Sequence, residues 1–167
     1  PLQMTACWQC GRLIAGLLED STMTTNALVG TWRLLSWETR SVDGHISYPF
    51  GQDAVGYITY NPDGYMFVAI MRPNRAKFVT GDLLRGSAEE KVQAAESYAS
   101  YCGRYEFQGD RVMHYVELSL FPNWIGLSQE RLVELAGNRL TLSTRPILLD
   151  GKQQTAHLVW ERVSGTT

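Results

Sequence analysis

Long apolar runs, cysteines and surplus positive charge are all scarce in this sequence. Its apolar stretches fall far short of the ~20 residues that a membrane helix needs, so we expect no membrane span. The formal net charge is -2, which gives no electrostatic attraction to phosphate backbones and argues against a nucleic-acid partner. The same charge disfavours polybasic attachment to a membrane surface.

The three cysteines, Cys7, Cys10 and Cys102, are too few to build the disulfide framework of a small secreted domain. A zinc site at Cys7 and Cys10 would need two further ligands, and the sequence has no second pair with suitable spacing. The apolar run at 13–18 is shorter than a signal-peptide core of roughly 7–15 residues. We therefore expect a cytoplasmic protein with no metal and no cofactor.

Motifs for nucleophilic, nucleotide-dependent or dinucleotide-dependent catalysis are also missing. The sequence therefore identifies no catalytic residue, and whether the protein is an enzyme stays open at this stage.

The chain is long enough to bury a core of its own. Its 167 residues, 44% of them hydrophobic, fit one domain that needs no disulfide or metal. Residues 1–26 differ from the rest, because 11–20 carry apolar side chains at helical spacing. We expect a tail with a short N-terminal helix over 1–26, packed on the domain or on a second subunit, and a β-rich domain over 27–167.

From residue 28 onward, β-type segments alternate with turn signals. The clearest hairpin joins 54–60 to 64–71 through Asn61-Pro62-Asp63-Gly64, where Pro presets φ, Asp bonds its own backbone and Gly closes the turn. About eight or nine strands at such short spacing predict an all-β, mainly antiparallel sandwich or barrel. The expected strands cover 29–42, 54–60, 64–71, 101–107, 111–120, 130–135, 139–144 and 155–163.

One segment breaks the β pattern. Residues 87–99 are rich in helix formers, and Ser87 with Glu90 three positions later forms a capping box. We expect a single inserted helix at about 87–99, lying over a mouth or a side of the β-domain.

Several segments carry a resemblance to a known family. Leu28-Val29-Gly30-Thr31-Trp32 contains the Gly-x-Trp with which lipocalin-type barrels open, and Trp160-Glu161-Arg162 offers an arginine of the kind that packs on that tryptophan. With supporting segments at 56–66, 114–117, 119–124 and 139–144, the chain resembles the bacterial and fungal lipocalin-like domain family from residue 28 to 163. The resemblance implies an eight- to nine-stranded up-and-down barrel that binds a small molecule. Because some lipocalin-fold proteins of biosynthetic pathways are cyclases or isomerases, the resemblance also implies these activities as alternatives.

Alternation along 111–120 places His114 inside such a barrel. A neutral histidine there would bond a ligand or act as a general base, and the alternative is a core histidine bonded to a neighbour. The opposite face, with Tyr115, Glu117 and Ser119, is expected to face solvent; with the faces inverted, it would supply the polar groups of the pocket. The face expected inside comprises Val112, His114, Val116, Leu118 and Leu120.

Ring-bearing side chains from several strands and loops are the main candidates for ligand contacts. The loop 121–126 is either a lid over the mouth or a bulged corner, and the cationic loop 72–77 either attracts a carboxylate or is simply solvated. A core filled by these side chains, without a cavity, is the alternative. The predicted ligand-binding residues are His114, Tyr57, Phe67, Tyr105, Trp124 and Met71.

Three functions follow as hypotheses. The leading one is binding of a small, largely hydrophobic molecule in the barrel cavity. The second is a cofactor-independent cyclase or isomerase acting on a polyketide-like or terpenoid substrate, with His114 and either Tyr105 or Glu117 moving the proton. The third is a non-catalytic interaction module with a filled barrel that forms a homodimer.

Overall fold

The computed structural model describes residues 26–164. The predicted N-terminal helix and the Cys7 and Cys10 pair lie outside this range. The helical elements are α1 (Ala88–Glu96) and the 3-10 helix η1 (Pro122–Trp124). The strands are β1 (Gly30–Ser41), β2 (Ile46–Ser47), β3 (Val55–Tyr60), β4 (Tyr65–Met71), β5 (Tyr98–Phe107), β6 (Arg111–Ser119), β7 (Ser128–Ala136), β8 (Arg139–Ser143), β9 (Ile147–Leu149) and β10 (Lys152–Arg162).

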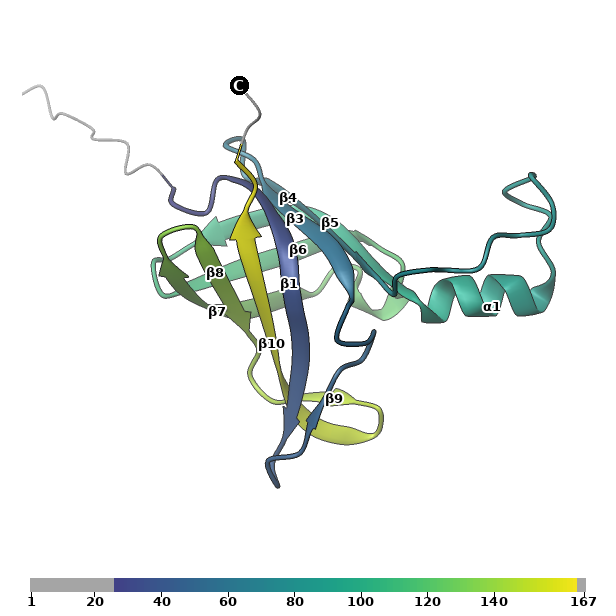
Figure 1. The fold of residues 1–167 in the computed structure, drawn as a ribbon. Coiled ribbons are helices and arrows are strands. Elements are labelled where there is room, and N and C mark those ends of the chain that lie inside the picture. Colours follow the sequence, from purple (N-terminus) through teal and green to yellow (C-terminus); the bar gives the residue numbers. More distant parts are fainter. Residues whose placement is uncertain (1–25, 165–167) are drawn as a thin grey trace, which may run out of the picture.

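Eight of these strands close into an antiparallel barrel (Figure 1). The order is β1-β3-β4-β5-β6-β7-β8-β10, and β10 pairs back onto β1 over the length of both strands, from Trp32 opposite Arg162 to Ser41 opposite Gln154. The short strands β2 and β9 extend the sheet beside β1 and β10. The predicted lipocalin-like all-β barrel is therefore confirmed.

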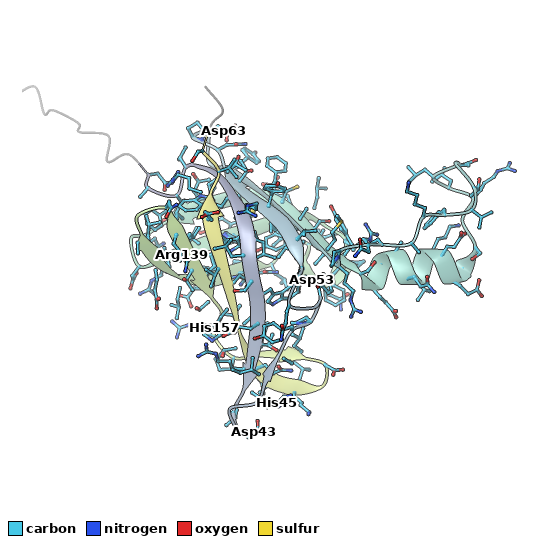
Figure 2. The ribbon with its side chains drawn as sticks, viewed as in Figure 1. Asp43, His45, Asp53, Asp63, Arg139 and His157 are labelled. Carbon is cyan, nitrogen blue, oxygen red and sulfur yellow. The ribbon has the colours of Figure 1, made fainter. Side chains whose placement is uncertain are left out.

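The two ends of the barrel differ in their connections. One end has the tight turns β3–β4, β5–β6 and β7–β8; Figure 2 labels Asp63, at the top of the view, in the first of these turns. The other end carries the long connections that contain α1, η1 and β9. Asp43 and His45, in the β1–β2 turn, mark its lower tip in Figure 2. Only this second end has connections long enough to border an opening.

Trp32 and Arg162 seal the end with the tight turns. The indole of Trp32 is fully buried and its N–H donates to the carbonyl of Leu28 at 2.8 Å. The guanidinium of Arg162 lies 4.0 Å from the centroid of the Trp32 ring and donates to the carbonyls of Val29 and Ala27 at 2.7 and 2.6 Å. The arginine that the sequence resemblance placed on this tryptophan is indeed there.

The inward face of β6 is shorter than expected. Leu118 and Leu120, predicted inside, are 67% and 43% exposed. The pairing of β5 with β6 slips beside Glu117, and one extra residue reverses the alternation of faces beyond it. Gly103 on β5 permits this bulge, because a Cβ atom there would lie 1.9 Å from the carbonyl oxygen of Tyr115.

Helix α1 begins where the sequence predicts and ends earlier. The Ser87 hydroxyl accepts from the Glu90 N–H, and the Glu90 carboxylate accepts from the Ser87 N–H at 2.7 Å. The helix ends at Glu96 because Tyr98 already pairs with β4 as the first residue of β5. No residue of α1 is buried, and the helix extends away from the barrel (Figure 1), so the core does not depend on it.

We expect Arg162→Met to lower the free energy of unfolding by about 2–4 kcal/mol, because it removes a cation–π contact and two charged hydrogen bonds. Urea denaturation measures the change. Arg33→Met is the matched control, since Arg33 forms only an exposed ion pair with Glu161 and should cost less than about 1 kcal/mol. Equal losses in the two variants would contradict a sealing role for Arg162.

Candidate functional site

A cavity of about 750 Å³ opens at the end of the barrel with the long connections. It lies between the last turn of α1, the start of β5, the loop with η1, the start of β7 and the segment 144–150. Its volume and mostly apolar lining are those of a small-molecule site. The large apolar side chains that line it are Leu120, Phe121, Trp124, Leu127, Ile147 and Leu148.

Trp124 forms the aromatic wall of this cavity. It is the last residue of η1, a short turn that Pro122 begins. Its ring packs edge to face on Phe121 at 5.5 Å and on Tyr101 at 5.6 Å between centroids. The loop 121–126, expected as either a lid or a corner, therefore lies at the rim of the cavity, and Tyr101 connects it to the barrel interior.

Behind Tyr101 lies a chain of three hydrogen-bonded side chains. His114 is 1% exposed and points inward from β6. Its Nδ1 lies 2.9 Å from the Tyr101 hydroxyl, and its Nε2 lies 2.8 Å from the Tyr60 hydroxyl. Both ring nitrogens are thus occupied, one as donor and one as acceptor. His114, Tyr60 and Tyr101 are not among the side chains that line the cavity, whereas Trp124, which packs on Tyr101, does line it.

Burial keeps two of these side chains, His114 and Tyr60, uncharged. Desolvation lowers the pKa of His114 well below its usual value, and the positive charge of Arg131 lowers this pKa further. Burial likewise raises the pKa of Tyr60 well above its usual value, and the nearby Tyr101 adds to this effect. His114 and Tyr60 are both neutral near pH 7.

Two polar side chains of β7, Gln129 and Arg131, also line the cavity. Gln129 lies opposite His114 in the β6–β7 ladder, and Arg131 lies opposite the buried Val112, so both belong to the inward row. The guanidinium of Arg131 donates to the side-chain oxygen of Gln129 and, at 2.9 Å, to the carbonyl of Glu130. Within residues 26–164 it forms no ion pair.

Sequence reasoning missed these β7 residues and the partners of His114. The alternation of Gln129, Arg131 and Val133 on one strand face was the available signal. This signal is weak, because an arginine in a strand usually marks the face that is exposed to solvent. Tyr60 and Tyr101 were recognisable as aromatic strand residues, but their contact with His114 joins three different strands.

Two predicted ligand contacts lie on the outer face of the barrel. Tyr57 and Phe67 are 54% and 50% exposed, because the inward positions of β3 and β4 are the even-numbered ones, from Gly56 and Met66 onward. They border a shallow groove of about 470 Å³ on the outer face. Met71 follows the inward Ile70 and does not line the cavity at the mouth.

Tyr105 lies inside the barrel, but its hydroxyl bonds to groups at the end with the tight turns. Its hydroxyl donates to the carbonyl of Asn61 at 2.9 Å and accepts from the side-chain amide of Asn26 at 3.0 Å. Glu117 lies on the outer face, 3.5 Å from Arg104. Neither is a partner of His114, which corrects the proton-transfer pairs expected from the sequence.

The cationic loop 72–77 does not reach the cavity. Arg72 lies over the ring of Phe50 at 6.0 Å, and Arg75 lies over Tyr98 at 5.1 Å. Figure 2 shows His45 at the lower tip, apart from His157 on β10. Across the described residues, no three metal-binding side chains come together and no helix is long and apolar enough to cross a membrane.

Comparison with known proteins gives one family and one curated relative. The model of the lipocalin-like domain family matches residues 29–163. A protein of Aspergillus oryzae described as a 4'-hydroxy-3'-methoxypropiophenone carrier protein is 36% identical over 111 residues, which cover 61% of this chain and the whole of that relative. No solved structure gives a significant match.

We expect His114 to make folding stability depend on pH. Because its folded-state pKa is depressed, the unfolded chain binds a proton that the folded chain does not once the pH falls below about 6.5. Wild-type stability should therefore fall by up to about 1.4 kcal/mol per pH unit between pH 6.5 and 5, and the corresponding slope should be smaller in His114→Gln. Urea denaturation across this window measures it.

His157→Gln is the control, since His157 is only half-buried beside Ser143 and Thr155. This variant should keep the wild-type slope. Parallel pH curves for wild type and His114→Gln would show that His114 is not held neutral.

Proposed function

Because this chain belongs to the lipocalin-like domain family, we propose that it is a carrier that holds a small, largely apolar molecule at the open end of its barrel. The observation that carries the proposal is the cavity of about 750 Å³ with Trp124 in its wall. The relative from Aspergillus oryzae, whose name describes a carrier of an aromatic ketone, supports the same role.

The lining favours a ligand with a flat ring. Trp124 and Phe121 meet edge to face at the rim, an arrangement that extends readily to a further ring packed on either face. Among the polar side chains that border the cavity, Gln129 and Arg131 belong to the inward row of β7. A molecule with an aromatic body and a polar substituent directed toward this row would match this arrangement.

We expect Trp124→Ala to weaken binding of 4'-hydroxy-3'-methoxypropiophenone roughly 10- to 100-fold, the equivalent of about 1.5–3 kcal/mol of lost apolar and ring contact. Isothermal titration calorimetry measures the affinity. Phe67→Ala is the control, because Phe67 lies on the outer face and should leave the affinity unchanged. A loss in Phe67→Ala with none in Trp124→Ala would move the site to the outer groove.

A second candidate is proton transfer to or from a ketone, as in an isomerase or cyclase. The chain from Tyr60 through His114 to Tyr101 favours it, because polar side chains within hydrogen-bond reach inside the barrel are what such chemistry needs. The test is exchange of the methylene protons of the propiophenone in deuterated water, followed by NMR. Exchange no faster than in buffer, or unchanged in Tyr101→Phe, would exclude this candidate.

The filled-barrel interaction module receives little support, since the cavity leaves one end of the barrel open. A homodimer and a cytoplasmic location remain predictions from the sequence. Sedimentation velocity of the whole chain tests the dimer directly.

A further inference from the structure

Arg131 is the charged side chain of the inward row of β7, between Gln129 and Val133. Val112, which lies opposite it on β6, is fully buried. The side chain of Arg131 itself is half-buried and borders the cavity. Two of its N–H groups donate to Gln129 and to the Glu130 carbonyl. A guanidinium has five N–H donors, so the others stay available to a bound molecule.

The acidic residues around the cavity do not neutralise this charge. Glu130 is held by Arg111, at 3.3 Å, and by Arg145. Glu96 and Asp150 border the cavity but are exposed to solvent. The positive charge of Arg131 therefore faces a mostly apolar space without a carboxylate partner among residues 26–164.

An unpaired, partly desolvated cation is costly unless something compensates it. Among the described residues, Gln129 and the Glu130 carbonyl accept hydrogen bonds from Arg131, and the rest of its charge is open to the cavity. We propose that Arg131, with Gln129 beside it, binds an acidic oxygen of the ligand, a phenol, enol or carboxylic acid, in its ionised form. This inference rests on the proposed carrier function and adds the chemical class of the ligand.

Phenol and carboxylic acid share this chemistry, and matched probes distinguish them. The phenol probe is 4'-hydroxy-3'-methoxypropiophenone. Its methyl ether, 3',4'-dimethoxypropiophenone, has the same body and cannot ionise. The carboxylate probe is 3,4-dimethoxybenzoate. A phenolate conjugated to a ketone absorbs at longer wavelength than the phenol, so the ultraviolet spectrum reports how much of the bound ligand is ionised.

In the wild type, we expect the pKa of the bound phenol to fall by about 1–3 units relative to the free phenol, as an opposite charge within a few ångströms produces. Arg131→Met should abolish this shift and weaken binding of the phenol at least about tenfold, the equivalent of 1.4 kcal/mol. Arg131→Lys should keep part of the shift, because it keeps the charge. The methyl ether should bind wild type and Arg131→Met equally, which also shows that the variant is folded.

Arg145→Met is the matched control, since Arg145 borders the same cavity but is paired with Glu130 and largely exposed. It should leave the pKa of the bound phenol in place. Binding of 3,4-dimethoxybenzoate that depends on Arg131, without such dependence for the phenol, would support a carboxylate as the acidic oxygen.

Two failures are distinguishable. If both ketones bind the wild type but neither the affinity nor the spectrum responds to Arg131→Met, the role of Arg131 is overturned while the carrier function stands. If none of the three probes binds the wild type, the carrier function for this ligand class falls, and the inference falls with it.

Discussion

The pairing of β1 with β10 is the interaction on which the rest of this structure depends. It joins the first strand of the sheet to the last and so converts an open sheet into a barrel with an inside and an outside. Gly30 makes the closure possible at one end, because its φ is 130° and a Cβ atom would lie 2.8 Å from the Arg162 guanidinium. With that end sealed by Trp32 and Arg162, only the opposite end is free to open.

The closed barrel also fixes where polarity lies. The interior holds packed indole and aliphatic groups, the neutral Tyr60 and His114 pair with Tyr101 bonded to it, and Arg131, whose side chain borders the cavity. The neutrality of His114 and the charge of Arg131 support each other. A protonated His114 would repel Arg131 and lose solvation, so His114 stays neutral beside the positive charge of Arg131.

Much of this fold was predictable because its signals are local. Turn residues predicted most of the strands, the capping box at Ser87 predicted the helix, and the resemblance that begins at Gly30-x-Trp32 predicted the barrel. The faces of β3 and β4 were not predictable, because both faces carry apolar or aromatic side chains and alternation cannot separate them. The bulge at Glu117 requires Gly103 on another strand, which no local pattern in β6 reveals.

The same geometry favours holding a ligand over transforming it. A general base at Tyr101 would have to pass its proton through His114, whose second nitrogen is bonded to Tyr60. Burial disfavours both a charged His114 and an ionised Tyr60, so neither can store the proton or the negative charge between steps. Hydrogen-bonded side chains of this kind transfer protons only in a single concerted step. In a carrier, the same hydrogen bonds need only hold Tyr101 in place against Trp124. The charge that we propose acts on a ligand is that of Arg131, and a fixed cation stabilises a bound anion without taking part in any reaction.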